Sequence, residues 1–451
     1  MTETTTAINP PGNLSIIEPA RRLPVRAQAD VVVCGGGPSG FVAAVAAARA
    51  GASVLLIERY GFLGGMATAG MVGPLSKFNL GGERIVDGIP GEFIRALHAA
   101  GGAIIDLPSG NIPYDVELYK LTAQRITRHA GVDILLHAQV AGAIVSKEES
   151  GWLTHVIVET KSGREAVAAK QFIDCTGAGD LVARTPLPCE LRNQRETGDL
   201  QPMSLYFRLG GVDTDKLNIL MAHDGMKYAN PELRAALAGE VKAGRLRNFG
   251  GPWAVHGSTI RPGEVSVNAT RITGNATDAD DLSSAELILR EETPVVIDIF
   301  RRHHKAFAHC YLIETATQIG IRETRAIRGL YTLTASDILG ARKFADAVAL
   351  GGHPIDVHKT DSGQSVKFLD APYQIPYRTL APEGSKNVLV AGGTLSATRE
   401  AFGSVRVQAQ CMALGQAAGV AAAICAQDGE SVSTLDGVAL SARLKAEGVL
   451  I

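Results

Sequence analysis

The sequence GGGPSG, Gly35–Gly40, joins the apolar run VVVC, residues 31–34, to an Ala-rich stretch, residues 41–50. Its glycines fit the pattern G-x-G-x-x-G. The first permits a tight turn, the second lets backbone N–H groups approach a pyrophosphate, and the third lets a helix pack on a strand. A second apolar run, SVLLIE, residues 53–58, follows. Strands without polar alternation are typical of a parallel sheet, so the stretch predicts a strand, helix, strand unit whose helix N-terminus attracts phosphates.

The context of the glycine turn distinguishes a dinucleotide site from any other tight turn. Glu58 ends the second strand 18 residues after Gly40, where a carboxylate accepts hydrogen bonds from a ribose hydroxyl pair and repels a 2′-phosphate. The doublet Gly64-Gly65 would let the backbone pass close to the long pyrophosphate and ribityl chain of FAD. Two further strands run into glycine loops, residues 173–180 and 388–393, and these features together favour FAD over NAD. The predicted FAD contacts are Gly35, Gly37, Pro38, Ser39, Gly40, Glu58, Arg59, Gly64, Gly65, Met66, Ala67, Thr68, Val140, Thr176, Gly177, Asp180, Gly392, Gly393, Gly403, Val405 and Arg406.

The composition argues against several classes of protein. The 451 residues include 44 basic and 46 acidic residues, a formal charge of −2, which does not indicate nucleic acid or anionic lipid as a partner. The six cysteines show no metal-binding or redox spacing, which indicates a reducing compartment and no metal site. Residues 1–28 lack a signal-peptide pattern, and the apolar stretch Cys411–Ala426 falls short of the roughly 20 residues that a membrane span requires. We therefore predict a cytoplasmic protein without a membrane partner.

The apolar patterns predict an α/β fold, a discontinuous, doubly wound Rossmann-type FAD domain with an inserted α+β substrate domain. A helix is expected over 115–130, followed by strands that form an antiparallel meander up to residue 176. We also expect a helix over 283–312 with a break at Pro294, and a last helix over 405–426. The expected segments are an N-terminal arm (1–28), three parts of the FAD domain (29–75, 112–190 and 376–430), a connecting segment (76–111), the substrate domain (191–375) and a C-terminal segment (431–451).

Several motifs, taken together, resemble a known family. They are the glycine turn with Glu58, LGGMAT (63–68), FIDCTGAGD (172–180), GIRETR (320–325), GGHPIDVH (351–358), YQIPYRTL (373–380) and VRVQAQCMALGQAAG (405–419). The set, which spans the chain from Ala29 to about Gln427, resembles the FAD-dependent oxidoreductase family of glutathione-reductase-type flavoproteins, distantly akin to the fumarate reductase flavoproteins. The resemblance implies bound FAD and a second domain that covers the isoalloxazine ring. The chain departs from the family pattern by having Gly393–Ser396 in place of Arg-Cys-Ile-Ser, and His353 in place of an aromatic residue.

The densest polar cluster is the run from Arg322 to Arg325. On a strand, Arg322 and Thr324 would share one face, and Glu323 would neutralise the other. We interpret Arg322 as the residue that binds an anionic or carbonyl group of the substrate by a two-pronged contact. The alternative is a structural Arg–Glu pair between two domains.

His353 and His358 flank Asp356 in a segment that we expect to be extended. A neutral histidine can accept a proton from a substrate hydroxyl while hydride leaves for flavin N5, and Asp356 would orient one of the two rings. His358 is favoured because its position fits the family motif, and the alternative is a hydrogen-bonded surface histidine. The amides around Gly403–Val405 are expected at a helix N-terminus that faces the flavin pyrimidine. Further substrate contacts are predicted at Arg325, Asn268, Arg271, His256 and Tyr377.

These features predict an FAD-dependent oxidoreductase that moves hydride between flavin N5 and a small polar substrate, at a C–OH or CH–CH unit. An external electron acceptor or O2 would complete the cycle, because we find no second complete G-x-G-x-x-G for a resident NAD(P)H. One alternative is a flavin monooxygenase that uses external NAD(P)H and O2. A second is a flavin-retaining, RNA-modifying or interaction scaffold, against which the balanced charge argues. A homodimer is a further possibility that the sequence leaves open.

Overall fold

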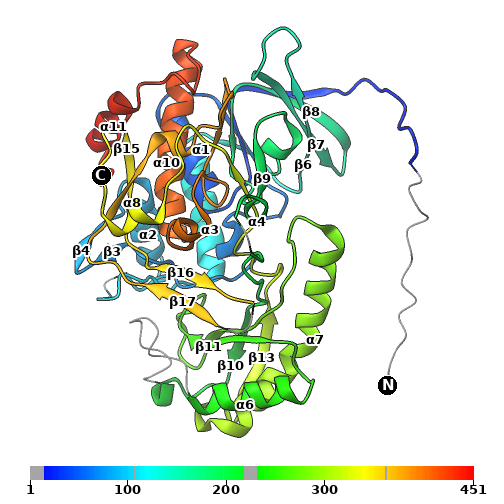
Figure 1. Cartoon of the computed structure of the whole chain (residues 1–451), viewed down its shortest axis with the longest axis vertical. Helices are drawn as coiled ribbons and strands as arrows, with labels where there is room; N and C mark the ends of the chain where they lie inside the picture. Colours follow the sequence, from blue (N-terminus) through cyan, green and yellow to red (C-terminus); the bar gives the residue numbers. More distant parts are fainter. Residues whose placement is uncertain (1–14, 106, 197, 218–230, 361–362) are drawn as a thin grey trace.

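The computed structural model describes residues 15–105, 107–196, 198–217, 231–360 and 363–451 (Figure 1). Of the expected N-terminal arm, residues 1–14 lie outside the described residues. Residues 15–24 have no regular secondary structure, and Figure 1 shows them leaving the body of the molecule. The first strand, β1 (Val25–Cys34), begins before residue 29, so the predicted border of the arm is wrong, because residues 25–28 already pair with β8 (Gly163–Asp174).

The main sheet confirms the predicted strand, helix, strand unit. β1 pairs in parallel with β2 (Val54–Ile57), and the helix α1 (Pro38–Arg49) connects them. The sheet order is β5-β2-β1-β8-β7-β6, with β19 (Val388–Val390) paired in parallel to β8. The predicted antiparallel meander is also confirmed, since β6 (Gln139–Val145), β7 (Leu153–Thr160) and β8 pair in that order. Because β19 comes from the far end of the chain, this main domain is discontinuous, as predicted.

The small residues of α1 let it pack closely against α10 (Gln408–Asp428). A Cβ added to Gly419 would lie 2.2 Å from the carbonyl oxygen of Ala43, so the two helices touch backbone to backbone. Helix α10 is long and apolar enough to span a membrane, which corrects the expectation that this stretch is too short, but 94% of its apolar window is buried inside the fold. It also begins later than predicted. A separate helix, α9 (Arg399–Val405), contains Gly403 and Val405 in its last turn and not at a helix N-terminus.

The inserted cap domain is an antiparallel sheet with helices on one face. Its order is β11-β12-β10-β13, and alternate residues of β12 (Val265–Thr270) face opposite ways. Val265, Val267 and Ala269 belong to the hydrophobic cluster under α6 and α7, whereas Ser266 and Asn268 face a cavity. The other bounds are β10 (Phe207–Gly210), β11 (Phe249–Val255), β13 (Tyr311–Thr315), α6 (Pro231–Lys242) and α7 (Ala279–His303).

The predicted break at Pro294 is absent from α7, which is continuous through the proline and ends at His303. Proline removes the hydrogen bond to the carbonyl of Arg290, and its ring crowds that carbonyl, but Arg290 is exposed. Leu289, before the proline, packs in the main core, and Phe300, after it, packs in the cap core. Tertiary packing of both halves therefore outweighs the local cost. Residues 311 and 312, expected as the end of this helix, belong to β13 instead.

The cap connects to the main domain through short strand pairs. The hairpin of β16 (Ile355–His358) and β17 (Gln364–Lys367) lies between the two domains in Figure 1. A second pair, β15 (Ala347–Gly351) and β18 (Tyr373–Pro376), packs in the main core, whereas the predicted border at residue 375 assigned all of this pair except Pro376 to the substrate domain. The remaining elements are β3 (Asn79–Leu80), β4 (Glu83–Arg84), α2 (Ile89–Ala99), α3 (Val116–His129), β5 (Asp133–Leu135), β9 (Cys189–Leu191), α4 (Arg192–Arg195), β14 (Arg325–Ile327), α8 (Ala335–Leu339) and α11 (Gly437–Ala446).

Replacing Gly419 by valine should lower the free energy of unfolding by about 1–3 kcal/mol, because a side chain there forces α10 away from α1. Urea denaturation measures this change. The control is Gly239→Ala in the exposed part of α6, where a Cβ meets nothing within 4 Å. That change should leave stability unaltered or raise it by up to about 1 kcal/mol. Equal stability of the Gly419 variant and the wild type would contradict the backbone contact.

Candidate active site

Two glycine turns of the main domain touch through their backbones. Gly64 donates its N–H to the carbonyl of Gly36 at 2.8 Å, and a Cβ added to Gly65 would lie 2.8 Å from Cα of Gly37. A Cβ on Gly40 would lie 1.8 Å from the carbonyl oxygen of Gly35, so only glycine fits there. In the first turn of α1, Pro38 has no N–H, and the N–H groups of Gly40 and Phe41 donate to the carbonyl of Gly37 at 2.9 and 3.1 Å, which leaves the N–H of Ser39 without an intrahelical bond. This backbone therefore offers amide donors at a helix N-terminus, an arrangement that suits a diphosphate.

Glu58 is buried behind the first turn and holds it in shape. Its Oε2 accepts the N–H of Gly36 at 2.6 Å, and its Oε1 accepts the N–H of Tyr60 at 2.9 Å. Burial raises the pKa of Glu58, and the two amide donors oppose that shift. A carboxylate has about four acceptor positions, so these two bonds leave capacity for the hydroxyls of a ribose.

The loops after β8 and β19 meet the same end of α1. Asp174, fully buried at the end of β8, accepts both the N–H and the hydroxyl of Thr176, and thereby shapes the loop that carries Gly177 and Asp180. Ser39 donates its hydroxyl to the carbonyl of Ala391 at 3.2 Å. The predicted cofactor segments thus converge at the carboxyl ends of parallel strands, where doubly wound folds bind their ligands.

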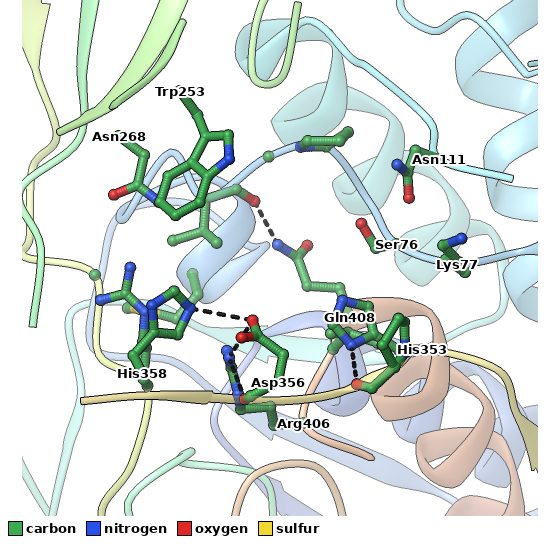
Figure 2. Close-up of a pocket in the computed structure, with 18 of the residues that line it drawn as sticks. Ser76, Lys77, Asn111, Trp253, Asn268, His353, Asp356, His358, Arg406 and Gln408 are labelled. Atoms are coloured by element: carbon green, nitrogen blue, oxygen red, sulfur yellow. Dashed lines mark hydrogen bonds and ion pairs between the residues drawn. The ribbon is translucent and has the colours of Figure 1, made fainter. Parts of the chain in front are cut away.

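A cavity of about 340 Å³ lies beside this cradle, between the main domain and the cap. Figure 2 shows Ser76, Lys77 and Asn111 on one side and Trp253 and Asn268 on the other. A backbone bridge positions Ser76, Lys77 and Asn111. Leu75 and Ile112 form this antiparallel bridge and bury their own side chains in the core. The side chains next to them then face the cavity. Further lining residues are Met66, Tyr206, Arg322, His353, Asp356, His358, Gln364, Arg406 and Gln408.

His358 and Asp356 project from the same face of β16. Nε2 of His358 lies 3.1 Å from Oδ2 of Asp356, and its Nδ1 lies 2.8 Å from Nη2 of Arg271. Burial, together with the charge of Arg322, lowers the pKa of His358 to about 3, and Asp356 opposes the shift. Both ring nitrogens of His358 are therefore already engaged.

His353 has a different environment. Its Nδ1 lies 2.8 Å from the carbonyl oxygen of Pro354, an acceptor, so this nitrogen carries the proton. Nε2 of the neutral ring is then an acceptor at the cavity wall. Burial lowers the pKa of His353 to about 4, against the influence of Asp356 and with the help of Arg406. The ring is thus neutral near pH 7 and able to take a proton.

Arg322 lies in an irregular segment before β14 and not on the strand that the sequence predicts. Its Nη1 donates to the carbonyl of Pro202 at 2.6 Å and to Oγ of Ser204 at 2.9 Å. Burial lowers the pKa of this guanidinium. Glu323 pairs with Arg399 instead, so the two neighbours do not form the Arg–Glu pair that was the structural alternative. Among the described residues, Arg322 has no carboxylate within ion-pair distance.

The model of the family described as "FAD dependent oxidoreductase" matches residues 30–444, which is most of the chain. The chain belongs to this FAD-dependent oxidoreductase family. It is therefore a flavoprotein enzyme with FAD as cofactor. The residues fit that group, since the cradle at Gly40 and Gly65 leaves no room for a Cβ and Glu58 retains acceptor capacity.

Individual relatives are more distant. Digeranylgeranylglycerophospholipid reductase 2 of Methanopyrus kandleri is 30% identical over 166 residues, which are 35% of this chain and 39% of that protein. The match thus spans about two fifths of that relative. A geranylgeranyl bacteriochlorophyll reductase-like protein of Thermoplasma acidophilum is 14% identical, with coverage of 94% and 84% and a TM-score of 0.49. A flavoprotein/dehydrogenase of Cytophaga hutchinsonii is 15% identical, with coverage of 90% and 80% and a TM-score of 0.44.

The structure separates the predicted substrate contacts of this flavoprotein. Asn268 lines the cavity and donates from Nδ2 to the hydroxyl of Tyr206 at 2.8 Å. Arg271 lies behind His358. Arg325 binds Asp180 and so supports the predicted cofactor loop. His256 and Tyr377 are not among the residues that line the cavity, and the buried hydroxyl of Tyr377 donates to the carbonyl of Val432 at 2.7 Å.

The predicted cofactor residues also differ in their surroundings. Pro38 begins α1, and Arg59 donates to Oε1 of Gln318. Thr68 donates its hydroxyl to the carbonyl of Leu63 and so closes the second glycine turn, while Ala67 is buried in the core. Val140 is buried in β6. A Cβ added to Gly393 would lie 3.1 Å from the carbonyl oxygen of Gly177.

Sequence reasoning missed several lining residues, namely Trp253, Tyr206, Ser76, Lys77 and Gln408. Trp253 is one of only two tryptophans in the chain, and its rarity was a usable signal. Gln408 is the first residue of α10. The helix N-terminus that the sequence placed at Gly403–Val405 lies instead at Gln408, beside the cavity, because a separate helix, α9, precedes α10.

Replacing Glu58 by glutamine should weaken FAD binding about tenfold, although the side chains have equal size. Both carboxylate oxygens accept backbone N–H groups, so the amide NH2 of glutamine must face a donor. Fluorescence titration of the apoprotein with FAD measures the change. Glu148→Gln, at an exposed turn, is the control and should bind FAD as the wild type does. If the Glu58 variant binds FAD as tightly as the wild type does, Glu58 does not have this role in FAD binding.

Proposed function

We propose that this oxidoreductase transfers hydride between its flavin and a small polar substrate that carries an anionic group. Bound FAD supplies a hydride acceptor at N5. Arg322 anchors the anionic group, and Nε2 of His353 exchanges the proton of a substrate C–OH or CH–CH unit. An external electron acceptor or O2 completes the cycle.

The observation that carries this proposal is the environment of Arg322. A half-buried guanidinium is costly unless an anion compensates it. Among the described residues, no carboxylate lies within ion-pair distance of Arg322, and the charge of Asp356 acts on it only from farther away. Within the described part of the chain, only Nη1 of Arg322 has hydrogen-bond partners, and these are a neutral carbonyl and a hydroxyl. The planar edge with Nε and Nη2 suits a two-pronged contact with a carboxylate or phosphate.

The charges around the cavity support an anionic ligand. Three cations, Lys77, Arg322 and Arg406, line it, together with a single carboxylate, Asp356. Both histidines are neutral near pH 7, because burial lowers their pKa values. The lining therefore carries a net charge of +2, which attracts an anion.

The choice between the two histidines follows from their hydrogen bonds. The sequence favoured His358 as the proton acceptor, but Arg271 and Asp356 occupy both of its ring nitrogens. Nδ1 of His353 donates to the backbone carbonyl of Pro354, which leaves Nε2 as an acceptor. We therefore assign the proton transfer to His353.

Arg322→Gln should raise KM for the substrate by about 10–100-fold while FAD content stays constant, since it removes a charge-assisted contact. The substrate is first selected by anaerobic bleaching of the flavin with a panel of hydroxy acids, polyols and amines. Arg443→Gln, an exposed variant, is the control. Unchanged KM and kcat in the Arg322 variant would contradict the anchor. NADPH oxidation coupled to oxygen insertion would instead indicate a monooxygenase.

His353→Gln should slow flavin reduction about 10²–10⁴-fold and remove the acidic limb of the pH profile. The base acts when neutral, and burial lowers its pKa to about 4. The wild-type kcat/KM should therefore be constant above that pH and fall as the pH drops through it. Stopped-flow reduction across pH measures the limb, with exposed His129→Gln as control. An acidic limb that survives in the His353 variant would exclude this residue as the base.

A further inference from the structure

Three buried side chains behind the cavity form a continuous hydrogen-bonded chain. Arg271, at the end of β12, reaches His358 at 2.8 Å, and His358 reaches Asp356 at 3.1 Å. Their exposed fractions are 1%, 6% and 9%. Gly250 makes room for the guanidinium, because a Cβ there would lie 2.6 Å from Nη2 of Arg271. The chain thus joins the cap sheet to the hairpin of β16 and β17.

The chemistry of arginine fixes the protonation of this chain. A guanidinium has only N–H donors, so Nδ1 of His358 must be the acceptor and carries no proton. The proton of the neutral ring is then on Nε2 and is donated to Oδ2 of Asp356. His358 can neither accept another proton nor turn to a substrate without breaking one of these bonds.

Asp356 is the end of the chain that reaches the cavity. It accepts from His358, from Nε2 of Gln364 at 2.6 Å and from Nη2 of Arg406 at 3.3 Å. Burial opposes its charge, but the hydrogen bond from His358 and the neighbouring charges hold the pKa of Asp356 well below its ordinary value. Its backbone is also fixed, since a Cβ on Gly403 of α9 would lie 2.8 Å from the Asp356 carbonyl oxygen. Figure 2 shows Asp356 between His358 and Arg406.

We propose that Arg271 and His358 are positioning residues. Arg271 locks His358 in the Nε2–H tautomer, and His358 in turn holds Asp356 ionised and aimed at the cavity. The fixed carboxylate lies near His353 and partly offsets the cations around it. The charged groups that face His358 are Arg271 directly after β12, Asp356 from its own strand, Arg322 from the segment before β14 and Arg406 after α9.

The lock has a consequence for the pH response of the site. While Arg271 is present, protonating Nδ1 would place a proton against a guanidinium, so His358 stays neutral over the pH range in which histidines ordinarily titrate. Without Arg271, the ring becomes free to charge beside Asp356. An imidazolium there cancels the Asp356 carboxylate, which is the charge that supports proton binding at His353. This kinetic consequence rests on the proposed function, whereas the tautomer itself does not.

The direct test is nitrogen NMR of the FAD-loaded protein labelled at histidine. His358, assigned with His358→Gln, should show a protonated Nε2 and an unprotonated Nδ1, without titration between about pH 5 and 8. A proton on Nδ1, or an ordinary titration of His358, overturns the inference and leaves the roles of Arg322 and His353 to their own tests.

Arg271→Met removes the donor and retains much of the side-chain volume. In this variant the titration of His358 should move into the range of about pH 5 to 8. The acidic limb of kcat/KM should then move to lower pH, because an imidazolium at His358 cancels the charge of Asp356 and so lowers the pKa of His353. Arg271→Lys retains a donor, so His358 in this variant should again show little or no titration between about pH 5 and 8. If Arg271→Met titrates as the wild type does, the lock is wrong. If the variant does not fold, the wild-type tautomer alone decides the question.

Discussion

The backbone contact between α1 and α10 is the constraint on which the rest of this flavoprotein depends. Gly415 lies against the Ser39 carbonyl, and Gly419 lies against the Ala43 carbonyl, at distances that no side chain permits. This approach brings the end of the chain back to the first glycine turn. It places β19 beside β8 and the N-terminus of α10 beside the cavity. The small residues of both helices are thus required by the geometry of the cofactor cradle as well as by the core.

The same constraint explains what the sequence revealed and what it did not. The glycine turn, Glu58 and the apolar strands are local patterns whose backbone requirements are visible in the residues themselves, and the main sheet follows them. The continuity of α7 through Pro294 depends on packing in two separate cores, which no local pattern expresses. The border of the cap domain likewise depends on where β15 and β18 pack. These errors are tertiary effects that override a local signal.

The candidate site shows a further limit of sequence reasoning. The sequence places His353 and His358 in one segment and does not show how the environments of their rings differ. Their difference arises from a guanidinium contributed by a strand 87 residues earlier and from a carbonyl next in the chain. A hydrogen bond to one ring nitrogen decides which nitrogen is left for a substrate. The motif identified the segment correctly, and only the fold assigns the two rings different tasks.

The location of these groups at the domain seam follows from the energetics of buried charge. These charged groups come from the cap, the hairpin and the main domain. The chain from Arg271 to Asp356 is buried, and Arg322 and Arg406 are half-buried. Buried charges stabilise a fold poorly unless every partner is in place. These charges therefore have all of their partners only when the cap, the hairpin and the main domain are packed together. A small loosening of the cap would hydrate Asp356 and release His358 from Arg271, so the electrostatic character of the cavity depends on the closed arrangement of the domains.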